Sequence, residues 1–189
     1  MSAPLDARLA LPVLGGASFP IRHKMLRALF GLWWALLCRW TPPPFYRWRS
    51  FSLRLFGARV ERNARISASA RIWYPPNLTM GQYAVLGPRA NCYCMGPVKI
   101  EDFATISQDA ELCGGTHIVD DIHDQLVVAP IRIGRQAWVA AGAFVGPGVE
   151  LGEGAVLGAR AVTMKSLAPW TIHVGNPARF LRERGRFDR

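Results

Sequence analysis

The chain has 189 residues, of which 50% are hydrophobic and 19% are charged, and its formal net charge is +10 at pH 7. This length and composition predict one main domain with a substantial core and exclude a disordered protein. The charge is uneven, because residues 1–65 carry a net +9, residues 66–159 a net −4 and residues 160–189 a net +5. An acidic middle between two basic ends favours two separate anionic partners over one continuous nucleic-acid surface, so no nucleic-acid partner is expected.

Residues 1–59 are predicted to form a helical, amphipathic cap, since they carry none of the repeats that follow. Their most apolar stretch, MLRALFGLWWALLC at 25–38, has 14 residues and contains Arg27. It is too short to cross a membrane, which takes roughly 20 apolar residues. Tryptophans and arginines between residues 21 and 50 would suit packing on the core or on a neighbouring subunit, and also contact with a membrane surface. We expect a cytoplasmic protein, with peripheral contact at the inner face of the membrane as an option.

From residue 60 to residue 162 the chain repeats a pattern of six residues, with an excursion after residue 117. The first residue of nearly every unit is aliphatic and the fifth is usually alanine, as in IGRQAW, VAAGAF, VGPGVE, LGEGAV and LGARAV at 133–162. A period of six fits neither a helix nor a lone strand. It fits a coil that turns a corner every six residues, with one large apolar side chain per side pointing inward and a small residue that lets the corner close.

This pattern predicts a mainly β fold, a left-handed parallel β-helix of hexapeptide repeats over residues 60–162, whose successive coils pair as parallel strands. The excursion loop is expected at 118–132. The repeat stops near residue 162, and residues 163–189 are expected to form a turn, a short C-terminal helix and a basic tail.

Five segments of the chain resemble the hexapeptide-repeat acyltransferases, and most closely their colanic acid biosynthesis branch. The segments are WRSFSLRLFGARV (48–60), ARIWYPPNLTMGQYAVLG (70–87), ISQDAELCGGTH (106–117), PIRIGRQAWVAAGAFVGPGVELGEGAVLGARAV (130–162) and PWTIHVGNPARFLRER (169–184). In that family three chains form a trimer, acetyl-CoA lies along the coils, and the active sites lie between neighbours. The resemblance implies a homotrimeric O-acetyltransferase that moves an acetyl group from acetyl-CoA to a sugar hydroxyl of a polysaccharide or its precursor.

The resemblance also implies that His117, at the edge of the excursion, is the catalytic general base. The chemistry needs such a group, because a neutral alcohol attacks a thioester poorly and an imidazole accepts a proton near neutral pH. The oxyanion that forms needs hydrogen-bond donors, which backbone N–H groups of the glycine-rich coils can supply. No covalent enzyme intermediate is required.

The group that orients His117 is open in the sequence. Members of the closest branch commonly have an aspartate directly after this histidine, where this chain has Ile118. Three nearby carboxylates are candidates, and so is a backbone carbonyl; the carboxylates are Asp120, Asp121 and Asp124. Asn91 is the nearest candidate for the family's acceptor-binding asparagine, and a polar corner residue is an equal interpretation of it.

For the acyl donor, the resemblance implies two groups of residues. Small or flat side chains line the pantetheine arm: Trp138, Ala141 and Ala159. Cations lie near the adenosine phosphates: Lys165, Arg179 and Arg182. The net charge of +5 after residue 159 is an independent reason to expect phosphates there, although Met164 replaces a threonine that the family has before the lysine.

Four alternatives stay open. A zinc site would use His117 and His123, but their spacing does not fit the β-helical carbonic anhydrases and no metal is expected. A Cys113–His117 nucleophilic pair is not needed for transfer to an alcohol. The acceptor could instead be a small diffusible amino sugar or antibiotic, or the chain could be a non-catalytic scaffold.

Overall fold

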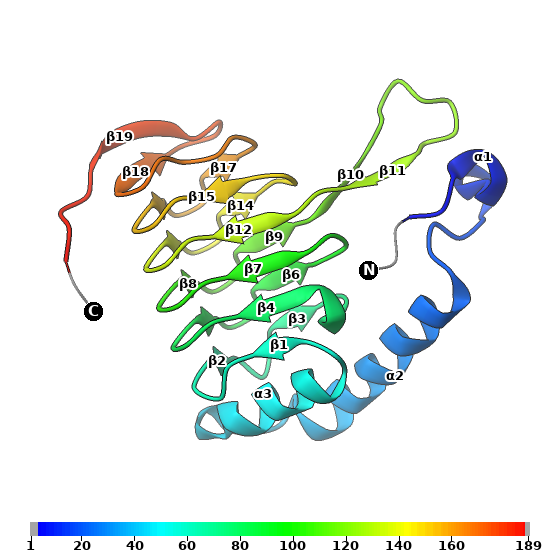
Figure 1. Cartoon of the computed structure of the whole chain (residues 1–189), viewed down its shortest axis with the longest axis horizontal. Coiled ribbons are helices and arrows are strands. Elements are labelled where there is room, and N and C mark those ends of the chain that lie inside the picture. The colour runs from blue at the N-terminus through cyan, green and yellow to red at the C-terminus, as the bar shows by residue number, and fades with distance from the viewer. Residues whose placement is uncertain (1–3, 188–189) are drawn as a thin grey trace.

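The computed structural model describes residues 4–187, and three parallel sheets form the sides of a three-sided β-helix (Figure 1). Sheet A contains β1 (Arg59–Val60), β4 (Leu78–Met80), β7 (Val98–Ile100), β12 (Ile131–Ile133) and β15 (Glu150–Leu151). Sheet B contains β2 (Arg65–Ile66), β5 (Val85–Leu86), β8 (Thr105–Ile106), β13 (Trp138–Val139), β16 (Val156–Leu157), β18 (Thr171–Val174) and β19 (Arg179–Glu183). Sheet C contains β3 (Arg71–Ile72), β6 (Asn91–Tyr93), β9 (Glu111–Cys113), β14 (Phe144–Val145) and β17 (Val162–Thr163). The predicted β-helix of hexapeptide repeats is confirmed.

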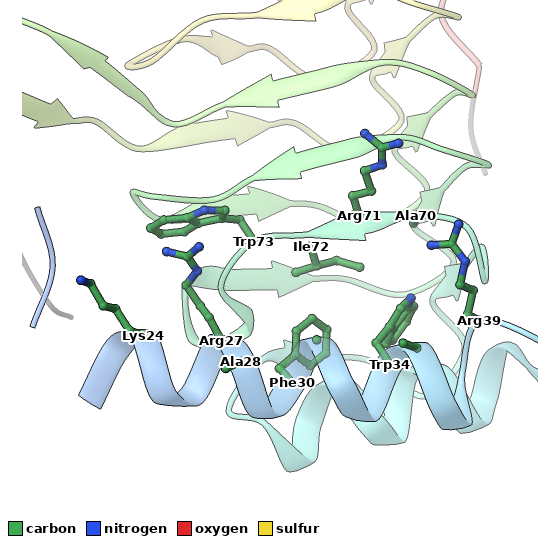
Figure 2. Close-up of a pocket in the computed structure, with 12 residues that line it drawn as sticks. Lys24, Arg27, Ala28, Phe30, Trp34, Arg39, Ala70, Arg71, Ile72 and Trp73 are labelled. Atoms are coloured by element: carbon green, nitrogen blue, oxygen red, sulfur yellow. The ribbon is translucent and has the colours of Figure 1, made fainter. Parts of the chain in front are cut away.

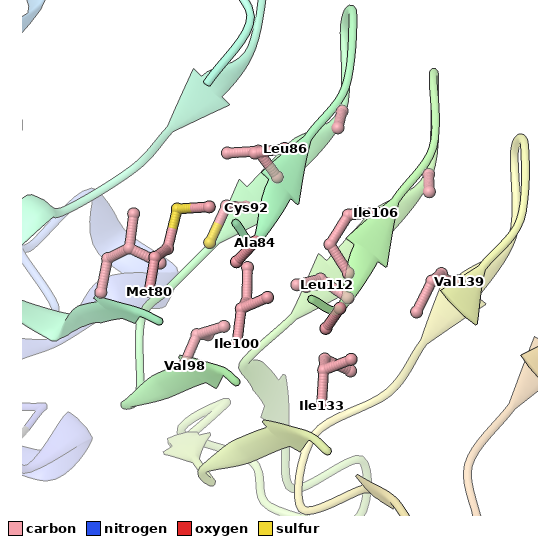
Figure 3. Packing of buried hydrophobic residues seen from close by; sticks show 14 of the residues in the cluster. Met80, Ala84, Leu86, Cys92, Val98, Ile100, Ile106, Leu112, Ile133 and Val139 are labelled. Atoms are coloured by element: carbon pink, nitrogen blue, oxygen red, sulfur yellow. The ribbon is translucent and has the colours of Figure 1, made fainter. Parts of the chain in front are cut away.

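The inward side chains fill the β-helix along its whole length, and Figure 3 shows part of this core. Along sheet B the first residue of each unit is at most 1% exposed, as at Ile66, Leu86, Ile106, Val139 and Leu157. The alanines in fifth position, such as those at 84, 104, 137 and 155, are equally buried. A larger side chain there would have no room, because protein interiors are close-packed.

Glycines serve the coils in two different ways. In second position, a Cβ on Gly87 would lie 2.8 Å from the carbonyl oxygen of Ile106 in the next coil, so the backbones can stack only without a side chain. In fourth position, Gly154 adopts φ +65°, a left-handed conformation that glycine reaches at little cost. Both uses follow from coils that stack at the spacing of parallel strands.

The N-terminal segment forms α1 (Ala7–Ala10), η1 (Pro12–Leu14), α2 (Ile21–Leu37), η2 (Pro43–Phe45) and α3 (Tyr46–Leu55). Helix α3 closes the first coil (Figure 1). Its buried Arg49 donates hydrogen bonds to the carbonyl oxygens of Ile66 (2.6 Å) and Pro43 (2.8 Å), and the Ser50 hydroxyl lies 3.0 Å from the carbonyl oxygen of Ala64. The cap therefore satisfies carbonyl groups that the open end of sheet B would leave unpaired.

The excursion is a β-hairpin of β10 (Gly115–His117) and β11 (Leu126–Val128) that projects from the stack (Figure 1). The coil has resumed at Ile131, so the expected loop at 118–132 covers the hairpin's tip and second strand together with the first residues of β12. The hairpin leaves the β-helix at the corner between sheets C and A, after β9.

The expected short C-terminal helix is wrong. Residues 179–183 form β19, which pairs antiparallel with β18 at the end of sheet B. A helix of a few residues is unstable by itself, whereas the edge of β18 offers a row of backbone hydrogen-bond partners. The sequence pattern carries no sign of that edge.

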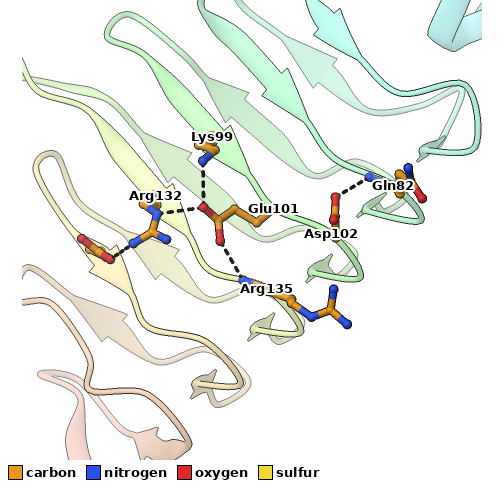
Figure 4. Close-up of polar contacts among 7 residues, drawn as sticks. Gln82, Lys99, Glu101, Asp102, Arg132 and Arg135 are labelled. Atoms are coloured by element: carbon orange, nitrogen blue, oxygen red, sulfur yellow. Dashed lines mark hydrogen bonds and ion pairs between the residues drawn. The ribbon is translucent and has the colours of Figure 1, made fainter. Parts of the chain in front are cut away.

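The outer face of sheet A carries a ladder of charges (Figure 4). Lys99, Arg132 and Glu150 are register partners on β7, β12 and β15. Glu101 accepts from Lys99 and from Arg132, each at 2.9 Å, and Arg132 also pairs with Glu150. These pairs are mostly exposed, so their contribution to stability is modest.

In the part of the chain that the structure describes, no helix is long and apolar enough to span a membrane.

Candidate functional site

His117 is the last paired residue of β10, opposite Leu126, where the loop of the hairpin begins. Leu126 is buried and clusters with Phe19 and Met95. The side chain of Gln125 ties the hairpin to the N-terminal segment, because its Oε1 accepts from the Ala7 N–H at 2.7 Å. The two segments that interrupt or precede the repeat therefore hold each other in place.

Two oxygens of one residue face the same nitrogen of His117. Its Nδ1 lies 2.9 Å from the carbonyl oxygen of Asp124 and 3.1 Å from that residue's Oδ1. Both are acceptors, so the proton of the neutral ring belongs on Nδ1 and a lone pair is left on Nε2. No hydrogen bond from the described residues reaches Nε2, and the side chain is 43% exposed. The ring is thus oriented and also accessible.

The other two aspartates of the loop do not contact the ring. The carboxylate of Asp121 accepts from the backbone N–H groups of His123 (3.0 Å) and Gln125 (3.3 Å), and so it shapes the turn. Asp120 is exposed and makes no hydrogen bond or ion pair within residues 4–187. Of the three candidate carboxylates, Asp124 alone lies within hydrogen-bond distance of the ring.

His117 borders a cavity of about 330 Å³ between the hairpin, sheet C and the N-terminal segment. Its other lining residues are Ser18, Phe19, Lys24, Arg27, Trp73, Tyr93, Met95 and Leu126. Asn91 is not among them. It lies on β6 beside Arg71 and Glu111 of the neighbouring strands, and Tyr93, two residues further along, takes the place next to the cavity.

A second histidine near the cavity is a packing residue. His23 of α2 is 1% exposed and stacks on Tyr74 and Phe19, with ring centroids 3.9 and 4.5 Å apart. Neither ring nitrogen has a hydrogen-bond partner in the described part of the chain. Burial, reinforced by the charge of Arg27, lowers the pKa of His23 to about 4, so this ring stays neutral near pH 7.

The residues expected near the pantetheine arm lie on two adjoining parts of the coil. Trp138 on β13 is 43% exposed, and its indole N–H donates to the Ser107 hydroxyl at 2.8 Å. Ala141 and Ala159 stack at the corner between sheets B and C, where the Arg160 N–H donates to the Ala141 carbonyl. Within residues 4–187 the N–H groups of both alanines make no hydrogen bond, so both remain available as donors.

The three cations expected near the phosphates are exposed at the C-terminal end of the β-helix. Arg179 and Arg182 lie on β19, in the same sheet as Trp138. Lys165 follows β17, at the corner from which the hairpin leaves but two strands further along sheet C. One chain thus brings His117 to Asp124 and Ala141 to Ala159, but it leaves His117 and Trp138 on different sides of the coil.

The sequence does not single out several residues that line the histidine's cavity, among them Lys24, Trp73 and Tyr93. Trp73 and Tyr93 do carry a signal, since an aromatic side chain in an outward position of a repeat has no core to fill. Lys24 and Arg27 could be found only through the packing of α2 against the coil. No group of three or more potential metal ligands occurs among the described residues.

Similar proteins fit this architecture. The chain is 44% identical over 156 residues to a protein of Escherichia coli (strain K12) named as the colanic acid biosynthesis acetyltransferase WcaF, and the match covers 81% of this chain and 86% of that protein. No family model matches the chain.

Solved structures show the same fold. The maltose O-acetyltransferase of Clostridium difficile 630 superposes with a TM-score of 0.70 at 24% identity, covering 88% of this chain and 86% of that one. A hexapeptide-repeat acetyltransferase of Vibrio cholerae O1 biovar eltor, solved with acetyl coenzyme A, superposes with a TM-score of 0.75 at 20% identity, covering 86% of this chain and 89% of that one.

Proposed function

Because the chain belongs to the hexapeptide-repeat acetyltransferases, we propose that it transfers an acetyl group from acetyl-CoA to a sugar hydroxyl of a polysaccharide or its precursor. The named relative supports a polysaccharide acceptor. The observation that carries the proposal is the state of His117, whose Nδ1 is engaged by Asp124 while Nε2 borders a cavity.

In this proposal Nε2 of His117 takes the proton of the acceptor hydroxyl as the oxygen attacks the thioester carbonyl carbon. A carbon–oxygen bond forms, and the carbonyl oxygen becomes an oxyanion that backbone N–H groups stabilise. Collapse breaks the carbon–sulfur bond, and the imidazolium returns the proton to the sulfur. Both oxygens of Asp124 that face Nδ1 stabilise the imidazolium between the two proton transfers.

The donor residues fit acetyl-CoA in chemical type. The free N–H groups of Ala141 and Ala159 suit the amide-like groups of a pantetheine arm, and Trp138 offers a flat surface beside them. The exposed cations Lys165, Arg179 and Arg182 suit phosphates.

A homotrimer would complete this site. A thioester that touches both Trp138 and His117 needs a second copy of the chain, because the two side chains lie on different sides of one coil. The family resemblance supports three copies with the sites between them.

Transfer of radiolabelled acetyl groups from acetyl-CoA to a pool of sugar acceptors tests the proposal. Replacing His117 by alanine is expected to lower kcat about a thousandfold, within the range of general-base catalysis, without unfolding the chain, because the side chain is 43% exposed. His123→Ala, on the same loop, is the matched control. Equal loss in both variants, or in neither, would refute the role of His117.

The exposed face of α2 is the reason to propose contact with a membrane surface. Its outer face carries a stripe of large apolar side chains that are 58–70% exposed: Ile21, Met25, Leu29, Leu32 and Leu36. Cations close to the stripe in sequence include Arg22 and Lys24 of α2 and Arg39 just after it. Each cation near an anionic membrane surface contributes about 1 kcal/mol. The acceptor would then be acetylated at the inner face of the membrane.

Flotation with vesicles that contain anionic phospholipid checks this contact. A variant with Leu29→Ser and Leu36→Ser should stay with the soluble fraction, whereas the wild type and the control Leu55→Ser, an exposed leucine of α3, should float. Equal flotation of all three proteins would rule out contact through α2.

A further inference from the structure

A groove runs between α2 and the first coil (Figure 2), and it adjoins the cavity of His117. Its volume is about 620 Å³. The two spaces share three lining residues: Lys24, Arg27 and Trp73. A ligand whose reacting group lies beside His117 can therefore extend along α2 without leaving the surface of one chain.

All four charged residues that line the groove are cations. Lys24 and Arg27 come from α2, Arg39 from the turn that follows it, and Arg71 from β3. Among residues 4–187, no aspartate or glutamate lines the groove or the cavity of His117. Within the described residues none of the four cations has an ion-pair partner. Cations gathered around one recess repel each other and raise the local concentration of anions.

Arg27 lies where the two spaces meet. Its guanidinium carbon is 4.1 Å from the centroid of the Trp73 ring, so a cation–π contact holds the side chain in place. In Figure 2 the side chain rises from α2 toward that ring, and Arg39 rises from the far end of the helix toward the coil. The donor groups of a guanidinium held in this way are free to bind an oxyanion.

The ion that matches this groove has more than one negative charge. A single carboxylate would engage one or two of the cations and leave the others repelling each other. Phosphate and diphosphate groups accept several charge-assisted hydrogen bonds at once, and three of the four cations are arginines, whose fork geometry suits phosphate oxygens.

The groove is separate from the cations proposed for acetyl-CoA. Lys165, Arg179 and Arg182 lie at the C-terminal end of the β-helix, while the groove lies at its N-terminal end (Figure 1). The intervening residues, 74–159, hold 4 Lys/Arg against 9 Asp/Glu and so carry a net charge of −5. The chain thus offers two anion sites, as its charge distribution indicates.

We propose that this groove binds the phosphate or diphosphate of a glycosyl phosphate acceptor, whose sugar reaches His117. The inference rests on the proposed function, because it assigns the class of the acceptor for that reaction. The phosphate could belong to a soluble nucleoside diphosphate sugar or to a lipid-linked sugar diphosphate. Both carry the same group, and the groove recognises that group.

Isothermal titration with inorganic pyrophosphate tests the groove directly. Saturating CoA is present throughout, so that the coenzyme's own phosphate site is occupied. Lys24→Gln and Arg39→Gln should each weaken pyrophosphate binding about tenfold. Arg22→Gln, which removes a cation of α2 that lines neither space, should bind like the wild type. Equal affinity in all four proteins would overturn the proposal, as would a changed oligomeric state in the groove variants without a change in pyrophosphate affinity.

Acetyl transfer distinguishes the two sources of phosphate and separates this inference from the proposed function. Wild-type protein is given UDP-glucose, polyprenyl diphosphate glucose in detergent, or free glucose. The proposal expects the diphosphate sugars to be used in preference to free glucose, and the better of the two identifies the source of the phosphate. Arg39 lines the groove but not the cavity of His117, so Arg39→Gln should raise the KM of that acceptor while KM for glucose stays the same. Equal use of free glucose would contradict the proposal. If no sugar is acetylated but pyrophosphate still binds in the groove, the proposed function fails and the anion site remains.

Discussion

The coils of the β-helix differ in their side chains from the two segments outside the repeat. These segments are residues 4–58 and the hairpin at 115–128. Each coil buries the same kinds of side chain in the same positions, so Ile106 and Val139 are both completely buried one coil apart. The outside segments expose large apolar side chains such as Leu29, and they hold cations such as Lys24 that form no ion pair with the other described residues. The repeat builds a rigid support, and most of the residues that line the proposed acceptor groove lie outside the repeat.

The same contrast explains why the histidine can be positioned accurately. The base of the hairpin is fixed by β9 and β12 of adjoining coils, and its other side is held by the N-terminal segment through Gln125. A loop that is anchored on both sides can keep a partly exposed ring in one orientation. A site built from the coil itself would have only backbone corners and outward side chains to work with.

The largest expected difference between the two regions is in how far a truncated side chain lowers the free energy of unfolding. Ile106→Ala removes a completely buried side chain of the coil, and the free energy of unfolding should fall by about 3 kcal/mol. Leu29→Ala on α2, where the side chain is 58% exposed, should change it by less than about 0.5 kcal/mol. Urea unfolding of both variants measures this, and similar losses would mean that α2 is covered in solution.

Acidification should lower the free energy of unfolding through His23 of the N-terminal segment. Because the pKa of His23 is about 4 in the folded chain against 6.5 for an ordinary histidine, only the unfolded chain binds a proton there between these values. Stability is therefore complete above pH 6.5 and falls as the pH drops toward 4, by about 2 kcal/mol at pH 5.

Urea unfolding at pH 7 and pH 5 measures this loss. His23→Phe keeps the stacking on Tyr74 and Phe19 without the titrating ring, and it should reduce the loss by that amount. His123→Phe is the control at the partly exposed histidine of the hairpin. An unchanged pH dependence in His23→Phe would show that His23 does not account for the loss.

The smallest effect concerns the orientation of His117. Asp124→Asn keeps the backbone carbonyl that Nδ1 contacts at 2.9 Å and removes only the charged oxygen at 3.1 Å. We expect kcat to fall about tenfold, with KM for the acceptor unchanged. Asparagine tolerates the left-handed φ of 54° at this position, and Asp120→Asn is the matched control. A larger effect in the control would move the orienting role away from Asp124.

The sequence predicts the coils well because nearly every unit repeats the same pattern, an aliphatic first residue and a small fifth residue. It does not predict β19, since the partner of that strand is the edge of the β-helix and not a neighbour in sequence. The cationic groove is equally absent from any local pattern, because it combines Arg71 of the coil with cations of α2. Local periods report side chains that face a core, and they do not report which separate surfaces meet.

The position of the coenzyme sulfur relative to His117 tests the central claim most directly. In a crystal structure of the assembled protein with CoA, we predict that the sulfur lies within about 6 Å of Nε2, the space that one acceptor hydroxyl needs between base and thioester. We also predict that Trp138 of a second copy lies beside the same coenzyme. A sulfur more than twice as far from Nε2, or an imidazole turned away from it, would contradict the account.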